Sequence, residues 1–264
     1  MKGGDVAAAA TGDEDGSTLD ALGTEGARPE LADLDLWSTA DALQLFVDDQ
    51  QAVVEAVRAA ARSIAAVVDA VAERMAAGGR LIYVGAGTGG RMAAVDAAEI
   101  GPSYGLSGRV VAVFAGGVDA LLDGREYYED QPEKSAAELT ALNLTASDVV
   151  MGVSASGRTP YVLSGIAAAR TVGARTIGFA CVSGSPLAAS CELAIEIPTG
   201  AEIIAGSTRL KAGSVQKVVL NAISTLVMVR LGRTYGNLMV DVVADNAKLR
   251  RRALRVVTQA TGVD

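Results

Sequence analysis

Five short apolar runs recur along the middle of the chain, and helix-like segments separate them. The runs are Leu81–Val84, Val110–Phe114, Val149–Val153, Thr176–Ala180 and Leu193–Ile197. Each is rich in β-branched residues and nearly continuous in apolar residues, which is typical of strands buried on both faces of a parallel sheet. The pattern therefore predicts an α/β fold, a five-stranded parallel sheet flanked by helices, with ligands bound at the carboxyl ends of the strands.

Helical periodicity dominates on either side of these runs. Residues 36–77 carry apolar positions at helical spacing, with Ser38 placed to begin a long helix and Gly78-Gly79 to end it. After the last run, Lys211–Arg230 and Asn237–Arg255 predict two more helices. The chain should thus have helical N-terminal and C-terminal segments around the sheet.

These patterns predict one domain over residues 24–264, with the N-terminal helical segment at 24–78 and the C-terminal helices within 205–264. Residues 1–23 are rich in glycine, alanine and acidic residues and show no periodicity. We expect them to form a disordered acidic tail.

Charge and composition exclude several functions. The net charge of −8 argues against nucleic acid and against an anionic membrane surface as main partners. We see no secretory signal and no run of about 18 uninterrupted apolar residues, so we expect a cytoplasmic protein. The chain has no histidine, which removes histidine bases, Ser-His-Asp triads and histidine metal ligands, so acid–base chemistry falls to carboxylates and other side chains.

The clearest candidate site follows the third run, in the sequence VVMGVSASGRTPY. Ser154, Ser156, Gly157 and Thr159 stand between the apolar run and a helix that begins near Tyr161. A turn of this kind offers hydroxyl groups, free backbone N–H groups and the positive end of a helix dipole to one anion. We therefore expect it to bind a phosphate.

The first run ends in a second glycine-rich turn, GAGTGGR. It matches the dinucleotide pattern GxGxxG, but no acidic residue stands at the end of the second run to hold a ribose. The better interpretation is a second phosphate- or sugar-binding turn, in which Thr88 donates its hydroxyl and Gly89 lets the ligand approach the backbone.

Two glutamates are candidates for proton transfer. Glu99 precedes the helix-breaking pair Gly101-Pro102, and Glu129 follows the second run. Both are expected on loops or helix ends at the carboxyl edge of the sheet, where a partly buried carboxylate can have a raised pKa. Composition alone favours a surface or capping carboxylate for each of them. The loop from Glu202 to Lys211 is one more anion-site candidate, or simply a capped loop.

These residues resemble the N-acetylmuramic acid 6-phosphate etherases, bacterial enzymes with a sugar isomerase (SIS) fold. The resemblance is carried by LIYVGAGTGGR (81–91), DAAE (96–99), YYED (127–130), LTASDVV (144–150), SASGRTPYV (154–162), GSTRLKAGSVQKVVLN (206–221) and YGNLMVDVVADNAKL (235–249). The similarity runs from about Thr24 to about Gly262. It implies a three-layer SIS fold and a homodimer with the active site near the subunit interface.

The resemblance also implies a reaction, which is cleavage of the ether between the lactyl group and C3 of the amino sugar. Removal of the C2 proton, loss of lactate and addition of water need carboxylates and a phosphate anchor, and no metal or redox cofactor. Glu99 would be the principal acid and base, with Glu129 as the second catalytic residue.

Other residues would bind the phosphorylated amino sugar. The resemblance assigns phosphate and hydroxyl contacts to Thr88, Ser154, Ser156 and Thr159. Three more residues are candidates for sugar contacts or for assisting ring opening, namely Glu202, Ser207 and Lys211.

This sequence departs from the family pattern at three places. Gly89 stands where the family usually has a serine, Ile100-Gly101-Pro102 replaces a cysteine followed by two prolines, and the sequence ends at Asp264 where the family commonly continues. Two alternatives therefore stay open. One is a regulator that binds a sugar phosphate without turnover, and the other is a phosphosugar isomerase or an etherase of another substrate.

Overall fold

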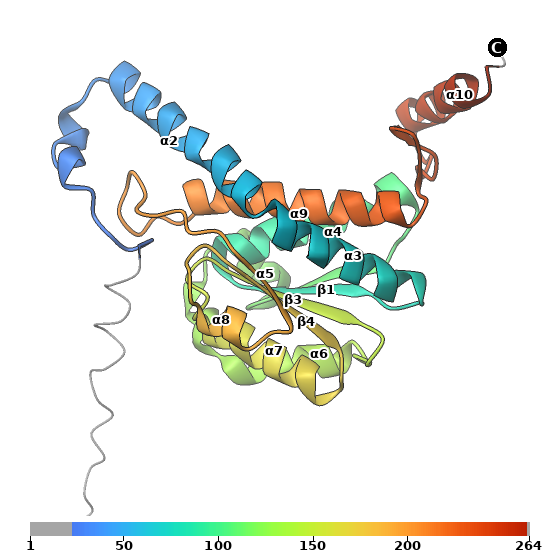
Figure 1. Ribbon diagram of the computed structural model, residues 1–264, viewed down its shortest axis with the longest axis horizontal. Coiled ribbons are helices and arrows are strands. Elements are labelled where there is room, and N and C mark those ends of the chain that lie inside the picture. Colours follow the sequence, from blue (N-terminus) through green and yellow to red (C-terminus); the bar gives the residue numbers. More distant parts are fainter. Residues whose placement is uncertain (1–22, 263–264) are drawn as a thin grey trace, which may run out of the picture.

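The computed structural model describes residues 23–262, and the predicted acidic tail lies outside this range apart from Gly23. Figure 1 shows three layers, with a sheet in the middle and helices on both faces. The strands are β1 (Leu81–Gly85), β2 (Val110–Phe114), β3 (Val149–Ser154), β4 (Arg175–Ala180) and β5 (Leu193–Glu196). They lie in the order β2-β1-β3-β4-β5 and all pair in parallel. The predicted five-stranded parallel sheet is confirmed.

Helices precede, separate and follow these strands. Two short 3-10 turns, η1 (Pro29–Leu31) and η2 (Leu34–Leu36), lead into the first long helices. The α-helices are α2 (Thr39–Ala59), α3 (Ala61–Ala76), α4 (Gly87–Tyr104), α5 (Gly117–Leu122), α6 (Pro132–Ala141), α7 (Pro160–Thr171), α8 (Pro186–Ala189), α9 (Lys211–Arg230) and α10 (Ala247–Thr261). A further 3-10 turn, η3 (Glu126–Asp130), follows α5, and a small hairpin of β6 (Thr234–Tyr235) and β7 (Leu238–Met239) follows α9.

Alternate side chains of the strands enter two separate apolar layers. Tyr83, Met151 and Phe179 point to the face covered by α3, α4 and α9. Ile82 and Val150 point to the opposite face, which α6, α7 and α8 cover. Figure 1 shows α9, α4 and α3 on one side of the sheet and α7, α6 and α8 on the other. Burial on both faces explains why each strand reads as a continuous apolar run.

The core helix α9 is long and apolar enough to cross a membrane by length and composition, with a mean hydropathy of 1.4. More than half of that apolar window, 56%, is buried inside the protein. Val215, Val219 and Ile223 are fully buried, in one cluster with side chains of α3 and α4. The apolarity of α9 is therefore accounted for by packing in the core.

Two predicted helices differ from those observed. The helix over 36–77 is interrupted at Ala60, which separates α2 from α3. Alanine-rich periodicity gives no stop signal there, although α3 packs on the core and α2 extends away from it (Figure 1). The helix predicted to begin at Asn237 begins at Ala247, because Gly236 turns the hairpin first and the Asn246 side chain then accepts a hydrogen bond from the Leu249 N–H.

The sheet order places two turns next to each other. From β1 the chain crosses to β2 on one side, and it later returns to β3 on the other side of β1. Gly85 at the end of β1 pairs with Val153 near the end of β3. In open parallel sheets, ligands bind outside the carboxyl ends of strands where the order reverses in this way. The two predicted glycine-rich turns therefore meet at one edge of the sheet.

Candidate active site

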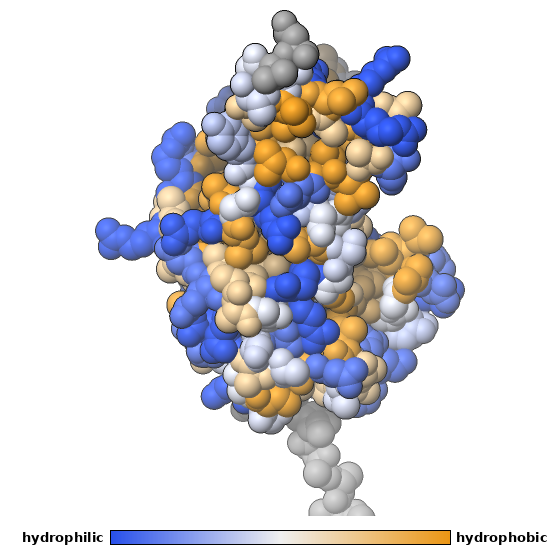
Figure 2. Space-filling view, turned by 90° about the vertical axis from the view of Figure 1, so that its right-hand side faces the viewer, coloured by the Kyte–Doolittle hydropathy of each residue, from blue (hydrophilic) through white to orange (hydrophobic). Residues whose placement is uncertain are grey.

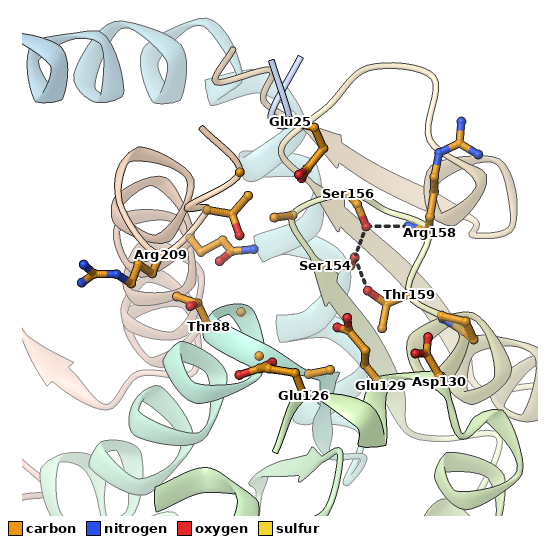
Figure 3. Close-up of a pocket in the computed structure, with 18 of the residues that line it drawn as sticks. Glu25, Thr88, Glu126, Glu129, Asp130, Ser154, Ser156, Arg158, Thr159 and Arg209 are labelled. Carbon is orange, nitrogen blue, oxygen red and sulfur yellow. Dashed lines mark hydrogen bonds between the residues drawn. The ribbon is translucent and has the colours of Figure 1, made fainter. Parts of the chain in front are cut away.

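A cavity of about 790 Å³ opens at this edge of the sheet. It is lined by the turn after β1, the turn after β3, η3, the loop before α9 and the N-terminal segment at Glu25, together with Pro186 of α8 and Gln216 of α9. Figure 3 shows these segments around the cavity, with η3 below and Glu25 above. The cavity has the position expected for the ligand site of a sheet with this strand order.

The turn after β3 forms one wall of the cavity and is held by its own side chains. The Ser154 hydroxyl lies 2.8 Å from that of Thr159 and 3.3 Å from that of Ser156. The Gly157 N–H donates to Ser154 Oγ at 3.0 Å, and the Arg158 N–H donates to Ser156 Oγ at 3.2 Å. These bonds shape the turn in advance at the N-terminus of α7, where hydroxyl and N–H groups suit an anion.

Gly157 is required in this turn for two physical reasons. Its φ of +64° lies in the left-handed region that favours glycine. A Cβ at this position would also overlap Ser185 at the start of α8. The turn therefore packs closely on α8. The Gly157 carbonyl accepts a hydrogen bond from the Leu187 N–H of α8 at 3.0 Å.

The turn after β1 forms the opposite wall. Thr88 and Gly89 belong to the first turn of α4 and line the cavity. A Cβ on Gly90 would lie 2.6 Å from the backbone of Gly85, so glycine permits the close packing of α4 on β1. The cavity is therefore bordered by the N-termini of two helices, α4 and α7, whose dipoles favour a negatively charged ligand.

Carboxylates gather along one side of the cavity. Figure 3 shows Glu126, Glu129 and Asp130 presented from η3, below Ser154 and Thr159. Burial raises the pKa of Glu129, and the negative charges of Asp130 and Glu126 raise it further. A carboxyl group with a raised pKa can take up and release a proton nearer to neutral pH. Glu129 therefore has the properties of a general base beside an anion-binding turn.

The structure brings together most of the predicted binding residues. Six of the predicted positions besides Glu129 line this cavity: Thr88, Gly89, Ser154, Ser156, Thr159 and Ser207. They come from the first turn of α4, the turn after β3 and the loop before α9, which meet at this edge of the sheet.

Glu202 and Lys211 do not line the cavity, and the structure gives both of them other partners, so their sugar contacts stay a prediction. The Glu202 carboxylate is fully buried and accepts hydrogen bonds from the Lys211 and Ala212 N–H groups, both at 2.9 Å. It thereby satisfies the N-terminus of α9. The Lys211 ammonium is 3.2 Å from Asp49 and donates to the Ala201 carbonyl at 3.0 Å. Glu202 thus fastens α9 to the loop before it, and Lys211 links α9 to Asp49 of α2.

Glu99 also lies outside this cavity. The prediction that the helix ends before Gly101-Pro102 is wrong, because α4 continues through Pro102 to Tyr104. Glu99 follows Thr88 by eleven residues, or about 16 Å along the helix axis. Its side chain is 63% exposed, with Lys217 Nζ at 3.7 Å. A proline in the last turn removes only one late hydrogen bond, which explains why it does not end α4 earlier.

Comparison with known proteins places the chain in a family. Residues 63–170 match the family "Glucokinase regulatory protein N-terminal SIS domain", and residues 126–226 match the SIS domain family. The N-acetylmuramic acid 6-phosphate etherase of Streptomyces coelicolor is 53% identical over 247 residues, which is 93% of this chain and 79% of that protein. The protein of the same name from Rubrobacter xylanophilus is 54% identical over 92% of this chain and 81% of its own length. This chain belongs to the N-acetylmuramic acid 6-phosphate etherase family.

Solved structures show the same fold as this etherase-family chain. The protein c3406 of Escherichia coli CFT073, solved as a ligand complex, superposes with a TM-score of 0.56 at 22% identity, covering 76% of this chain and 97% of its own. A phosphoheptose isomerase from Francisella tularensis gives 0.56 at 18% identity, covering 72% and 98%. The three-layer SIS architecture predicted from the sequence is confirmed.

Several residues in the cavity of this etherase-family protein were missed from the sequence. Glu126 and Asp130 flank Glu129, and their place in one acidic segment was a usable signal. Glu25 lies before every strand, so reasoning from strand ends gives no reason to select it. Arg158 and Arg209 belong to the two polar motifs, after strand β3 and before helix α9. Gln216 had the clearest signal, because it is a polar residue on the buried face of α9.

Proposed function

We propose that this protein cleaves the D-lactyl ether of N-acetylmuramic acid 6-phosphate to give N-acetylglucosamine 6-phosphate and D-lactate. The observation that carries the proposal is a cavity with a preformed anion turn on one wall and Glu129, with its raised pKa, beside it. Three relatives that bear the etherase name are 45% to 54% identical over more than nine tenths of this chain. In this role the protein would act in the cytoplasm on sugars recovered from peptidoglycan.

The turn after β3 supplies the anchor in this scheme. Ser154, Ser156 and Thr159 receive the 6-phosphate together with the N–H groups at the start of α7. A phosphate is doubly negative near neutral pH, and charge-assisted hydrogen bonds to it are about twice as strong as neutral ones. With no histidine in the chain to activate them, Ser154 and Ser156 act as anchors and not as nucleophiles.

The carboxylates carry the proton transfers. Opening of the sugar ring exposes an aldehyde at C1, which acidifies the proton on C2. Glu129 removes that proton, the electron pair forms the C2–C3 double bond, and the C3–O bond to the lactyl group breaks. The departing lactyl oxygen takes a proton from a carboxylic acid. Water then adds its hydroxyl group at C3 and a proton returns to C2, which restores the saturated sugar.

Glu99 takes the second carboxyl role in this proposal, and its position requires a second copy of the chain. About 16 Å of helix separates Glu99 from the cavity end of α4. We infer a homodimer in which the partner subunit's Glu99 completes each site, donating a proton to the departing lactyl oxygen. Closed two-fold dimers are the commonest oligomers among soluble proteins.

Exposed apolar surface supports such a dimer. On the outer sides of the helices near Glu99, large apolar side chains are exposed to solvent, namely Val95, Val218, Leu226 and Val229. Helix α2 exposes a further set, Leu43, Phe46, Val47 and Val54. Figure 2 shows more apolar surface around the C-terminal end, where α10 exposes Leu254 and Val257. Surface of this kind is typical of protein–protein contacts.

The test is release of D-lactate from N-acetylmuramic acid 6-phosphate by the purified protein. We expect release by the wild type, and loss of release with retained N-acetylglucosamine 6-phosphate binding in Glu129→Gln. The exposed Glu133, on the first turn of α6, provides the matched control Glu133→Gln, which should stay active. Binding without turnover by the wild type would favour the regulator. Interconversion of aldose and ketose phosphates without lactate would favour the isomerase.

A further inference from the structure

The side-chain amide of Gln216 is buried beside the cavity without a hydrogen-bond partner. Its exposed fraction is 0%, and it lies among the residues that line the cavity. Within residues 23–262, neither its nitrogen nor its oxygen has a partner. Buried amides are nearly always hydrogen-bonded, because an unpaired buried donor or acceptor loses its bonds to water without replacement. This residue therefore retains an energetic cost that the fold alone does not explain.

The amide is held close to the turn after β1. A Cβ placed on Gly89 would lie 3.0 Å from Gln216 Nε2 and 3.1 Å from Val153 Cγ1. The absence of a side chain at Gly89 therefore leaves space for the Gln216 amide between the first turn of α4 and the end of β3. Neighbouring inward positions of α9, such as Ala212 and Leu220, are apolar and fully buried. Gln216 lies between these two apolar positions on the buried face of α9, at the place where that face reaches the cavity.

The chemistry of an amide limits what it can bind there. The group offers N–H donors at one end and a carbonyl acceptor at the other. A phosphate or a carboxylate presents only acceptors when fully ionised, so it would leave the Gln216 oxygen unpaired. Sugar hydroxyl groups donate and accept, and two neighbouring hydroxyls match both ends of one amide.

We propose that Gln216 is a substrate-binding residue. Its amide forms hydrogen bonds with hydroxyl groups of the sugar, while the turn after β3 binds the phosphate. The proposal rests on the proposed function only in taking a sugar phosphate as the ligand. A site built to hydrogen-bond hydroxyl groups discriminates strongly against ligands that lack them, because its buried polar atoms are then left unpaired. Gln216 thus makes the cavity selective for a polyhydroxylated phosphate over phosphate itself.

The experiment compares two ligands and measures stability without either. The variant Gln216→Met keeps the length of the side chain and removes both polar atoms. We expect its affinity for N-acetylglucosamine 6-phosphate, measured by titration calorimetry, to fall about 10- to 100-fold. Its affinity for inorganic phosphate should change by less than about twofold. Without ligand, its melting temperature should equal or exceed that of the wild type, because the unpaired amide is gone.

Two further variants sharpen the comparison. Gln216→Glu keeps the shape of the side chain but loses the donor, so it should also weaken binding of the sugar phosphate. Gln259→Met changes the same residue type at an exposed position of α10, and both affinities should stay as in the wild type.

The outcomes separate this inference from the etherase proposal. Equal loss of affinity for both ligands would place the amide on the phosphate and overturn the inference. A lower melting temperature with unchanged affinities would make Gln216 a structural residue. If the wild type does not prefer the sugar phosphate over inorganic phosphate, the inference also fails. If that preference depends on Gln216 but no lactate is ever released, the inference stands and the etherase function fails.

Discussion

The hydroxyl oxygens of Ser154 and Thr159 lie 2.8 Å apart at the wall of the cavity, and Ser154 also accepts the Gly157 N–H. The variant Ser154→Ala should weaken binding of N-acetylglucosamine 6-phosphate and of inorganic phosphate together, about tenfold or more. Because the Gly157 N–H loses its acceptor, the free energy of unfolding should fall by about 1 kcal/mol.

Titration calorimetry and urea unfolding measure these two effects. A matched control is Ser63→Ala in α3, which also removes one hydroxyl hydrogen bond, to the Ala60 carbonyl, but lies outside the cavity. It should leave both affinities unchanged. A Ser154→Ala protein that binds inorganic phosphate as tightly as the wild type would contradict the placing of the phosphate in this turn.

The raised pKa of Glu129 predicts a pH dependence. A general base works only when deprotonated, so kcat/KM should fall as the pH drops through this pKa, at a higher pH than for an ordinary glutamate. The variant Asp130→Asn removes a neighbouring negative charge, which should lower the pKa of Glu129 and move the acidic limb to lower pH.

Lactate release measured across pH tests this shift, and Asp245→Asn, an exposed position outside the cavity, is the control. The raised pKa of Glu129 also predicts how the free energy of unfolding changes with pH. Since the folded protein holds the Glu129 proton more tightly than the unfolded chain does, the stability from this group is present at acidic pH. It is lost as the pH rises through the folded pKa. The variant Glu129→Gln should therefore melt no lower than the wild type at neutral pH. An acidic limb that stays in place in Asp130→Asn would argue against Glu129 as the base.

Alanine substitutions at two glycines in the left-handed region can distinguish the cost of backbone strain from the cost of a steric clash. Gly157 and Gly184 have nearly equal φ values, +64° and +65°, but a Cβ would overlap Ser185 at position 157 and meet open space at position 184. Gly184→Ala should cost about 1–2 kcal/mol of unfolding free energy. Gly157→Ala should cost more and also reduce phosphate affinity, as chemical unfolding and calorimetry would show. Equal costs at the two positions would mean that the packing of the turn on α8 contributes nothing.

Glu99 and Glu129, the two glutamates proposed to transfer protons, can be tested for action across a subunit interface. Glu99→Gln and Glu129→Gln should each abolish lactate release alone. If the partner subunit's Glu99 completes each site, a mixed dimer contains one intact site. Subunits mixed in equal amounts and allowed to exchange should then recover about one quarter of the wild-type activity. A mixture that stays inactive, although exchange is demonstrated by size or label, would contradict the shared site.

Much of the fold could be predicted because the strands are buried on both faces. Runs such as Val149–Val153 then consist almost entirely of apolar residues, and their ends lie within one or two residues of the observed strands. The break at Ala60 could not be predicted, because alanine supports the helix on either side of it. Both α2 and α3 pack against α9, so the direction of the chain on either side of Ala60 depends on tertiary contacts.

The site was most predictable where a motif directly follows a strand. Ser154 and Thr88 were found because the carboxyl ends of parallel strands meet at one edge. Glu202 was a candidate for a sugar contact, and in the structure its carboxylate accepts the first N–H groups of α9. The sequence alone does not distinguish these two roles. Glu25 comes from the N-terminal segment, and only the folded chain places it in the cavity.

The central claim is that the bond between C3 of the sugar and the lactyl oxygen breaks and that water adds to C3. The most direct measurement is mass spectrometry of both products after turnover of N-acetylmuramic acid 6-phosphate in ¹⁸O-labelled water. The proposed elimination and addition predict the label at C3 of N-acetylglucosamine 6-phosphate and no label in the newly formed hydroxyl group of D-lactate. Label in that lactate hydroxyl, or no cleavage at all, would contradict the account.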